Sequence, residues 1–213
     1  MKIVCISDTH AKWKNLIIPE CDLLISTGDF SFRGEIHLVN EFHKWLNKQP
    51  AKHIISVMGN HETWVEQNFQ LAKEMAIAEC PRVHFIAEGL IEIEGFKIWC
   101  SAITPYFFNW AWNRFRGEEI KRHWDIIPDD IDILATHGPA YDILDKDPQG
   151  NPVGCEELSK RIENLTNLKV HTFGHLHESY GSIEKNGVLY INASICNDQY
   201  KPVNKPIVFR IDK

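Results

Sequence analysis

The chain has 213 residues, of which 44% are hydrophobic and 24% charged, so it can bury a sizeable core within the size range of one domain. Its formal net charge of −6 excludes the strongly basic surface that binding of long nucleic acids requires. No apolar run approaches the roughly 20 residues of a membrane span, so we expect a single domain over residues 1–213 that does not enter a membrane.

Strand and helix patterns alternate in the first half of the chain. Short apolar, β-branched runs at residues 2–6, 22–26 and 54–57 predict three strands. Apolar residues at helical spacing predict a helix over about 35–47, and a second helix is predicted over 64–78. Each predicted strand ends where a short polar motif begins.

Strand patterns dominate the second half. Residues 90–99 alternate around a turn and predict a hairpin, while 131–135 and 169–173 predict two buried strands. Residues 188–191 and 207–211 read as closing strands. Strands with helical crossovers followed by hairpin-like strands favour an α/β fold, with two sheets packed face to face and helices outside.

Five short motifs follow predicted strands, and their polar side chains are typical metal ligands. They are Asp8-Thr9-His10, Gly28-Asp29, Gly59-Asn60-His61-Glu62, Thr136-His137-Gly138 and Gly174-His175-Leu176-His177. Residues i and i+2 of an extended segment point to the same side, so Asp8 and His10 can approach one cation together, as can His175 and His177. Nitrogen and oxygen donors without thiolate favour manganese, iron, zinc, nickel or cobalt over a structural zinc site. The motifs predict a hydrolytic site with two neighbouring metal ions.

Asp29 and His61 are the predicted catalytic residues. Asp29 stands alone between the two clusters of motifs and is the natural bridge between cations about 3.5–4 Å apart. Asn60 offers a neutral carboxamide oxygen as a ligand, and His61 beside it can donate a proton to a departing alkoxide. We expect a metal-bridging hydroxide to attack phosphorus in line.

In order and content the motifs resemble D-x-H, G-D, G-N-H-[ED], G-H and G-H-x-H of the calcineurin-like metallophosphoesterases, over residues 8–177. The resemblance implies a four-layer α/β/β/α sandwich of two mixed sheets and a centre of two divalent ions. We favour manganese over iron, zinc, nickel, cobalt or magnesium. Carried over position by position, the resemblance gives one ion held by Asp8, His10, Asp29 and His177, the other held by Asp29, Asn60, His137 and His175, and His61 as the general acid.

Residues 107–113, 136–139, 174–181 and 190–194 further resemble the metallophosphoesterase domain-containing subfamily first described from brain. Some members of that subfamily carry a glycine where this chain has His175, so the histidine implies an active metal site. The resemblance implies a small phosphate ester as substrate, in particular a phosphodiester, with cyclic nucleotides among the candidates.

An aromatic-rich insertion or lid is predicted at about 105–124, and two interpretations of it stay open. Its rings can pack against the core, or they can stack on a base or aryl group of the substrate. On the second interpretation the substrate-binding residues are Asn109, Trp110, Arg114 and Arg116, with Asn113 also near the phosphate.

Three further residues are assigned supporting roles. Glu62 is expected to orient the His61 loop or to accept a backbone hydrogen bond, and His171 to lie in the core behind the metal ligands. Arg33 is more consistent with a solvated arginine at a helix start than with a phosphate ligand.

Two other functions share this ligand set or part of it. A phosphomonoesterase, such as a protein or nucleotide phosphatase, would use the same ligands. A non-catalytic, metal-dependent nucleotide-binding or scaffold protein is disfavoured because His61 and His175 are both present.

The cysteines indicate a reducing environment. The six cysteines form no C-x-x-C pair, and Cys5 and Cys100 lie in apolar runs where a free thiol packs as a small hydrophobe. Residue 1 leads into a strand pattern rather than a secretion signal. We therefore expect free thiols and a cytoplasmic location.

Overall fold

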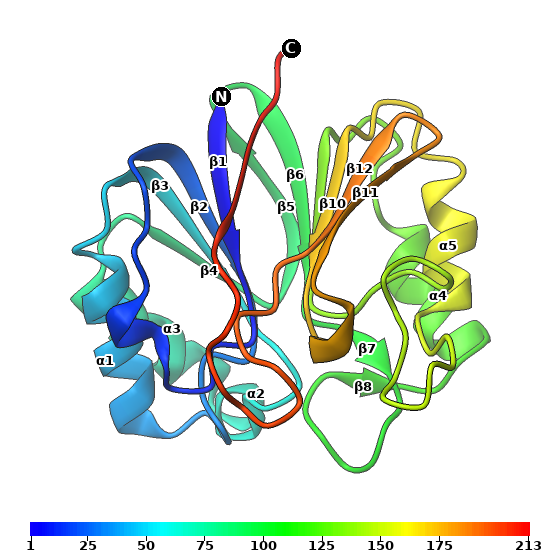
Figure 1. Cartoon of the computed structure of the whole chain (residues 1–213). Coiled ribbons are helices and arrows are strands. Elements are labelled where there is room, and N and C mark those ends of the chain that lie inside the picture. Colours follow the sequence, from blue (N-terminus) through cyan, green and yellow to red (C-terminus); the bar gives the residue numbers. More distant parts are fainter.

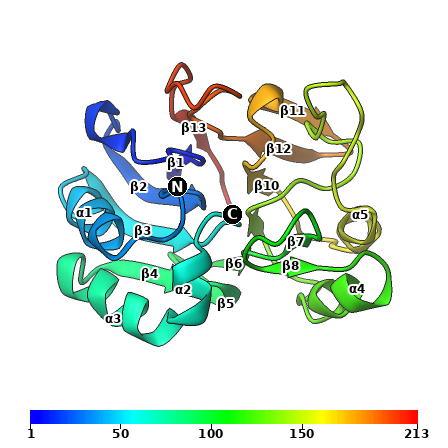
Figure 2. The same cartoon turned by 90° about the horizontal axis from the view of Figure 1, so that it is seen from below.

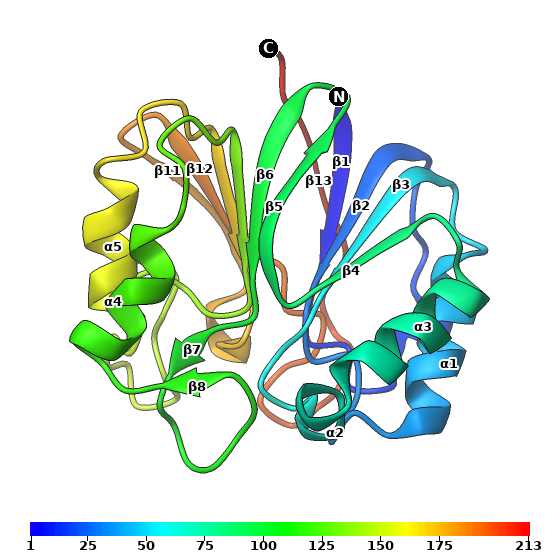
Figure 3. The same cartoon turned by 180° about the vertical axis from the view of Figure 1, so that it is seen from behind.

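Two mixed sheets pack face to face, and each is covered on its outer side by helices, in the computed structural model of residues 1–213 (Figure 1). The view from behind in Figure 3 shows the same order, with α4 and α5 outside one sheet and α1 and α3 outside the other. The predicted α/β/β/α sandwich is therefore confirmed. None of the helices is long and apolar enough to cross a lipid bilayer.

The first sheet has five strands in the order β13-β1-β2-β3-β4. The strands are β1 (Lys2–Ile6), β2 (Cys21–Thr27), β3 (Ala51–Val57), β4 (Val83–Ile86) and β13 (Ile207–Arg210). β1 to β4 are parallel to their neighbours, whereas β13 runs antiparallel to β1. Helical segments connect β2 to β3 and β3 to β4, as the alternating pattern predicts, whereas a loop with one short turn at Trp13–Asn15 joins β1 to β2.

Three helices accompany this sheet, namely α1 (Ile36–Leu46), α2 (Thr63–Gln67) and α3 (Phe69–Glu79). The prediction of one helix over 64–78 was wrong, because the chain leaves helical geometry at Asn68, with φ −130° and ψ 37°. The Asn68 side-chain amide donates a hydrogen bond of 3.0 Å to the carbonyl of Trp64. Such local side-chain bonds compete with helix continuation.

The second sheet has six strands in the order β11-β12-β10-β9-β6-β5. They are β5 (Glu88–Ile93), β6 (Phe96–Ser101), β9 (Ile133–Thr136), β10 (Val170–Phe173), β11 (Gly181–Lys185) and β12 (Val188–Asn192). The central pairs are parallel, and the hairpins β5–β6 and β11–β12 are antiparallel. Helices α4 (Glu118–Asp125) and α5 (Glu156–Ile162) cover it, and β7 (Thr104–Pro105) pairs with β8 (Asn113–Arg114).

The buried core has two parts, one between the sheets and beneath α1 and α3, and one between the second sheet and α4 and α5. The carboxyl ends of β1, β2, β3, β9 and β10 meet at one edge of the sandwich, which lies at the bottom of Figure 1 and faces the viewer in Figure 2. Two single-turn helices, Trp13–Asn15 and His177–Ser179, lie near this edge. The five motifs therefore gather at one place.

Candidate metal centre

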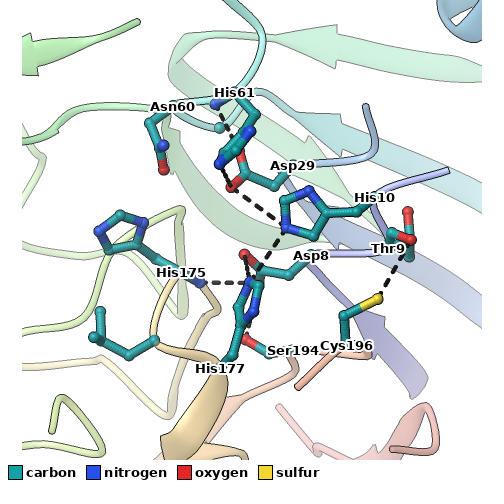
Figure 4. Close-up of polar contacts among 12 residues, drawn as sticks. Asp8, Thr9, His10, Asp29, Asn60, His61, His175, His177, Ser194 and Cys196 are labelled. Atoms are coloured by element: carbon teal, nitrogen blue, oxygen red, sulfur yellow. Dashed lines mark hydrogen bonds and ion pairs between the residues drawn. The ribbon is translucent and has the colours of Figure 1, made fainter. Parts of the chain in front are cut away.

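Each of the predicted ligands follows the carboxyl end of a strand. Asp8 and His10 follow β1, Asp29 follows β2 and Asn60 follows β3, while His137 follows β9 and His175 and His177 follow β10. These residues come from both sheets, and Figure 4 shows the two carboxylates and the imidazoles from the two sides turned toward one another. Packing of the sheets thus creates the site.

One group of donors consists of Asp8, His10 and His177, whose ligand atoms all lie within 4.8 Å of one another. The Nε2 atoms of His10 and His177 are 3.2 Å apart, and the Nε2 of His177 is 3.4 Å from the Oδ1 of Asp8 (Figure 4). The Oδ1 of Asp8 is buried, and the Nε2 of His177 at 3.4 Å is the donor near it. A buried carboxylate oxygen requires a positive charge beside it, which a protonated His177 or a cation supplies.

A second group consists of Asp29, His137 and His175, again within 4.8 Å. The Nε2 of His137 lies 3.4 Å from the Oδ2 of Asp29 and 2.8 Å from the Oδ1 of Asn60. Asp29 also reaches the first group, since its Oδ2 is 3.9 Å from the Nε2 of His10. Asp29 is thus the carboxylate that lies between the two groups.

The outer ring nitrogens of three histidines define their tautomers. The Nδ1 atoms of His10, His137 and His177 lie 3.2, 2.8 and 2.9 Å from the backbone carbonyls of Ser31, Thr27 and Asn197. Since a carbonyl only accepts, Nδ1 carries the proton, and in the neutral ring Nε2 presents its lone pair inward. The Nε2 atoms of His10 and His177 face each other at 3.2 Å, so either a proton on one of them or a cation must separate their lone pairs. With both rings neutral, the two lone pairs suit a divalent cation.

Charge and burial compete at the two carboxylates. Burial raises the pKa of Asp8, but hydrogen bonding to His177 and the charges of His177 and His137 outweigh it and leave the pKa below its usual value. At Asp29 burial is likewise outweighed, here by His137, His61 and His10, and the pKa lies well below the usual range. Both carboxylates are therefore ionised.

The histidines divide by how close they lie to a carboxylate. Burial lowers the pKa of His137 and of His177, yet Asp29 and Asp8 respectively outweigh it and raise each pKa to about 9. Burial dominates at His10 and His175, where it lowers the pKa to about 4 and about 3. The pocket therefore favours positive charge next to the carboxylates, and cations bound there would replace the protons on His137 and His177.

The backbone at the ligands is left-handed rather than extended. Asp8, His10, Asp29 and His175 have φ values of 51°, 39°, 52° and 69°. The expectation that extended geometry places His175 and His177 on one cation was wrong, because the left-handed turn at His175 directs its ring to Asp29 and His137 while His177 lies with Asp8 and His10. Residues other than glycine adopt this conformation at a cost of about 1–3 kcal/mol, which is typical of functional sites.

Two glycines allow the strand-end loops to approach the carboxylates. A Cβ atom on Gly59 would meet the Oδ1 of Asp29, and one on Gly174 would meet the Oδ2 of Asp8. The same Asp8 oxygen accepts hydrogen bonds of 2.9 Å from the Ser194 hydroxyl and from the backbone N–H of His175. The glycines thus make room for the hydrogen bonds that fix the carboxylates.

Glu62 is a completely buried carboxylate behind Asp29. Its two oxygens accept hydrogen bonds from the backbone N–H groups of Asp29 (2.8 Å), Gly59 (2.7 Å) and Ser31 (3.1 Å), and from the Ser31 hydroxyl (2.8 Å). Burial and the charge of Asp29 raise the pKa of Glu62 to about 8. The expectation that Glu62 accepts backbone hydrogen bonds is confirmed, and these bonds join the second and third motifs.

His171 lies in the core, as expected, rather than among the ligands. Its Nε2 is 2.7 Å from the Thr136 hydroxyl, which in turn donates a hydrogen bond of 2.7 Å to the carbonyl of Gly138. This chain supports the loop that carries His137.

Tyr200 was not anticipated from the sequence. Its ring is perpendicular to that of His10 at a centroid distance of 4.7 Å, and it lies 5.6 Å from the ring of His177. Its φ of 56° is again left-handed. No motif marked it, because its position depends on the loop after β12 folding back over the first motif.

A pocket of about 970 Å³ opens beside the donors. It is lined by Asp29, Asn60, His61, His175 and His177, and by an aromatic rim that includes Tyr106, Phe107, Phe108, Trp110 and Tyr200. Asn109, Trp110 and Arg116, three of the expected substrate residues, also line it, as does Arg33. Arg114 does not line the pocket. Its guanidinium instead donates hydrogen bonds to His123 and to the carbonyl of Asn113.

The aromatic segment combines the two interpretations drawn from the sequence. Trp124 is buried in the second part of the core, and Trp112 packs against both parts. Phe107 and Phe108, in contrast, are 53% and 70% exposed at the pocket rim. Movement of this rim as a lid stays a prediction.

Comparisons with known proteins agree with the motifs. The profile of the calcineurin-like phosphoesterase family matches residues 1–179. Metallophosphoesterase domain-containing protein 1 of Homo sapiens is 34% identical over 227 aligned residues, which cover 97% of this chain and 70% of the human protein.

Solved structures show the same fold at low sequence identity. Phosphopantetheinyl hydrolase from Mycobacterium tuberculosis is 14% identical with a TM-score of 0.63, covering 97% of this chain and 95% of the hydrolase. An archaeal phosphodiesterase is 18% identical with a TM-score of 0.50, covering 98% of this chain and all of the archaeal one. Family profile, relatives and fold agree, and the chain belongs to the calcineurin-like phosphoesterase family.

Proposed function

We propose that this protein is a two-metal phosphodiesterase that hydrolyses small phosphodiesters, with cyclic nucleotides among its substrates. The observation that carries the proposal is the convergence of inward-facing donor atoms from both sheets around Asp29, at the base of an open pocket. Membership of a dimetal-dependent family supports the same reading. A pocket of about 970 Å³ has room for a phosphate with two organic substituents.

Seven side chains would hold the metals. We assign one ion to Asp8, His10, Asp29 and His177 and the other to Asp29, Asn60, His137 and His175, in line with two of the three donor groups; the third, which joins His10, Asp29 and His61, places His61 beside both ions. Manganese is favoured because the donors are imidazole, carboxylate and carboxamide without thiolate. Two divalent ions there would acidify a water molecule and offset the charge that develops on the phosphoryl oxygens.

His61 is the proposed general acid. Its Nδ1 lies 3.0 Å from the carbonyl of Phe32, so this nitrogen carries a proton and Nε2 is free to act. Its backbone N–H donates a hydrogen bond of 2.9 Å to Asp29, which ties it to the centre. Acting as a general acid, His61 starts as the imidazolium with protons on both nitrogens; as the P–O bond to the leaving group breaks, the electron pair moves to the leaving oxygen, the Nε2 proton is transferred to that oxygen, and the neutral ring keeps its proton on Nδ1.

The pocket rim supports recognition of an organic substituent. Phe107 and Phe108 expose their rings, and Tyr200 lies on the side of His10. We assign the polar contact to Asn109, whereas the guanidinium of Arg116 is engaged by the carbonyls of Val153 and Gly154 and frames the pocket wall. Planar rings at the rim suit a nucleobase or an aryl ester.

The proposal is tested by assaying purified, manganese-loaded protein on bis-p-nitrophenyl phosphate, p-nitrophenyl phosphate and cyclic nucleotides, with metal content measured in the same preparation. Faster turnover of diesters than of the monoester is expected. Preference for the monoester would instead support the phosphomonoesterase alternative. Bound metal and bound nucleotide without turnover of any ester would reject catalysis and favour a scaffold protein.

We also propose a cytoplasmic location. All six cysteines are unpaired and buried, which supports a reducing compartment. Detection of the protein in a cytosolic fraction, with its thiols reactive only after unfolding, would test this.

A further inference from the structure

The indole of Trp110 is stacked on the imidazole of His61. The ring centroids are 4.3 Å apart and the planes differ by 30°. We propose that Trp110 is a positioning residue that holds the His61 ring in line with the leaving group, rather than a platform for the substrate. This inference rests on the proposed function of His61 as general acid.

The backbone that follows Trp110 is fixed to the third motif and to α2. The N–H of Ala111, a buried residue, donates a hydrogen bond of 3.0 Å to the carbonyl of Asn60, the residue before His61. The N–H of Trp112 donates one of 2.9 Å to the Oε1 of Glu66 in α2. Trp110 is therefore placed relative to His61 by neighbouring backbone bonds, and its ring cannot follow a swinging rim without breaking them.

The His61 side chain needs such a second constraint. Besides the contact of its Nδ1 with Phe32, the ring packs edge-on against the His10 ring at a centroid distance of 4.8 Å, and its Nε2 is 3.9 Å from the Oδ2 of Asp29. One hydrogen bond and one edge contact leave the ring able to tilt. Stacking on an indole removes this freedom, because rotation would separate the two ring faces.

Arg33 completes the arrangement from the loop after β2. Its guanidinium carbon lies 5.4 Å from the centroid of the Trp110 ring, within cation–π range. The backbone of Arg33 is itself fixed, since its carbonyl accepts a hydrogen bond of 3.0 Å from the N–H of Trp64. Arg33 is exposed, as the sequence suggested, and its guanidinium at the same time supports the tryptophan.

The stack also removes one indole face from the substrate. A nucleobase cannot use the face that His61 covers, whereas Phe107 and Phe108 remain exposed at the rim. Positioning and substrate stacking thus belong to different rings of the same segment.

The leaving group separates these two roles experimentally. A general acid accelerates loss of an alkoxide by a factor of about 100 or more, but contributes little when the leaving group is already a stable anion such as p-nitrophenolate. Trp110→Leu should therefore lower kcat for a cyclic nucleotide by roughly 10- to 100-fold and leave kcat for bis-p-nitrophenyl phosphate within about threefold, with KM little changed.

Two comparisons make the assignment specific. Trp110→Phe keeps a stacking ring and should recover most of the lost kcat. His61→Ala should show the same dependence on the leaving group, and the double variant should be no slower than His61→Ala alone, because both changes remove one function. Phe115→Ala is the matched control, since it truncates an exposed aromatic residue of the same segment that contacts Tyr106 and does not line the pocket.

A raised KM for both substrates with unchanged kcat in Trp110→Leu would overturn the inference and make Trp110 a substrate platform. Losses that multiply in the double variant would overturn it as well. An NMR readout does not depend on turnover. In Trp110→Leu the His61 ring protons should lose the ring-current shift that the indole causes. An unchanged chemical shift would contradict the stack. Failure of the wild-type protein to hydrolyse any of the esters would instead reject the proposed function, without affecting this NMR test.

Discussion

Replacing Glu62 by glutamine tests how far the metal centre depends on its supporting hydrogen bonds. The side chain keeps its size, but one of its two acceptor oxygens becomes an amide NH₂ that donates. Cations bound to Asp29 would oppose the charge that raises the pKa of Glu62, so in the metal-loaded protein we take the carboxyl as ionised, and both oxygens then face only donors, namely the N–H groups of Asp29 and Gly59 on one side and the N–H and hydroxyl of Ser31 on the other. No orientation of a glutamine satisfies all four.

The expected loss of unfolding free energy follows from the least costly orientation of the glutamine amide. With the NH₂ toward Ser31, the hydroxyl can turn to accept, and the Ser31 N–H is left unpaired in a fully buried site, at a cost of about 1–3 kcal/mol. The two bonds from Asp29 and Gly59 lose their charge assistance, about 1 kcal/mol each. Relief of repulsion between Glu62 and Asp29, which raises the pKa of Glu62, offsets part of this loss. We expect Glu62→Gln to lower the free energy of unfolding by about 2–4 kcal/mol.

Urea unfolding with saturating manganese measures this loss of unfolding free energy. A manganese titration of the same variant should show metal affinity reduced by roughly 10- to 100-fold, because Asp29 is less firmly oriented. Glu74→Gln is the control, since its carboxylate is exposed and accepts one bond from Gln70, and it should change stability by less than about 0.5 kcal/mol. A loss in Glu62→Gln no larger than in this control would refute the reasoning, and would mean that Glu62 is protonated and already donates.

Three more changes test separate features. Gly174→Ala would bring a Cβ against the Asp8 carboxylate and should weaken metal binding at least tenfold by calorimetry, whereas Gly187→Ala, in open space at φ 78°, should cost only about 1 kcal/mol of stability and leave metal affinity unchanged. Burial lowers the pKa of His43 to about 4. As the pH falls from 6.5 to about 4, this histidine is protonated in the unfolded chain but not in the folded protein, so the free energy of unfolding decreases. Between pH 7.5 and pH 5 the wild-type protein should lose about 2 kcal/mol of unfolding free energy through His43, and His43→Gln should lack this part of the loss. Urea unfolding at the two pH values measures it, and equal losses in the two proteins would disprove it. Removing bound metal with a chelator should lower the unfolding midpoint, because ions at 100 times their Kd stabilise the folded state by about 2.7 kcal/mol. An unfolding midpoint that does not change when manganese is added would argue against a metal site in the folded protein.

The fold was predictable from sequence where hydrophobic patterns were long. The β-branched run at 2–6 became β1, and the helical spacing after residue 35 became α1. Short elements carried too little pattern, so β4 and α5 were not anticipated, and β4 is an edge strand of four residues. The break between α2 and α3 falls at Asn68, whose side-chain amide bonds to the carbonyl of Trp64, within a helical pattern that otherwise continues.

The membership of the site was easier to predict than its geometry. Motif order was sufficient to name the residues that the structure brings together, from Asp8 to His177. The direction of each side chain was not, because strand alternation assumes extended backbone and the residues at the strand ends are left-handed. Tyr200, Trp110 and Arg33 acquire their positions through contacts between loops that are distant in sequence, and no spacing rule encodes those contacts.

The left-handed residues bear on whether the metals gather their ligands or find them in place. Asp8, Asp29 and His175 each hold a conformation that costs about 1–3 kcal/mol, which persists only where surrounding structure compensates. Here the compensation comes from protein groups. Ser194 and the His175 N–H bind Asp8, and the backbone N–H of Asp29 donates to Glu62. Because these bonds exist between protein atoms, the scaffold already orients the donors, and metal binding need supply only charge neutralisation. The centre should therefore stay folded when its metal is removed, unlike small domains whose fold depends on the ion. Substitutions in the supporting groups, which do not bind the metal themselves, should reduce metal affinity by disordering the ligands that they hold.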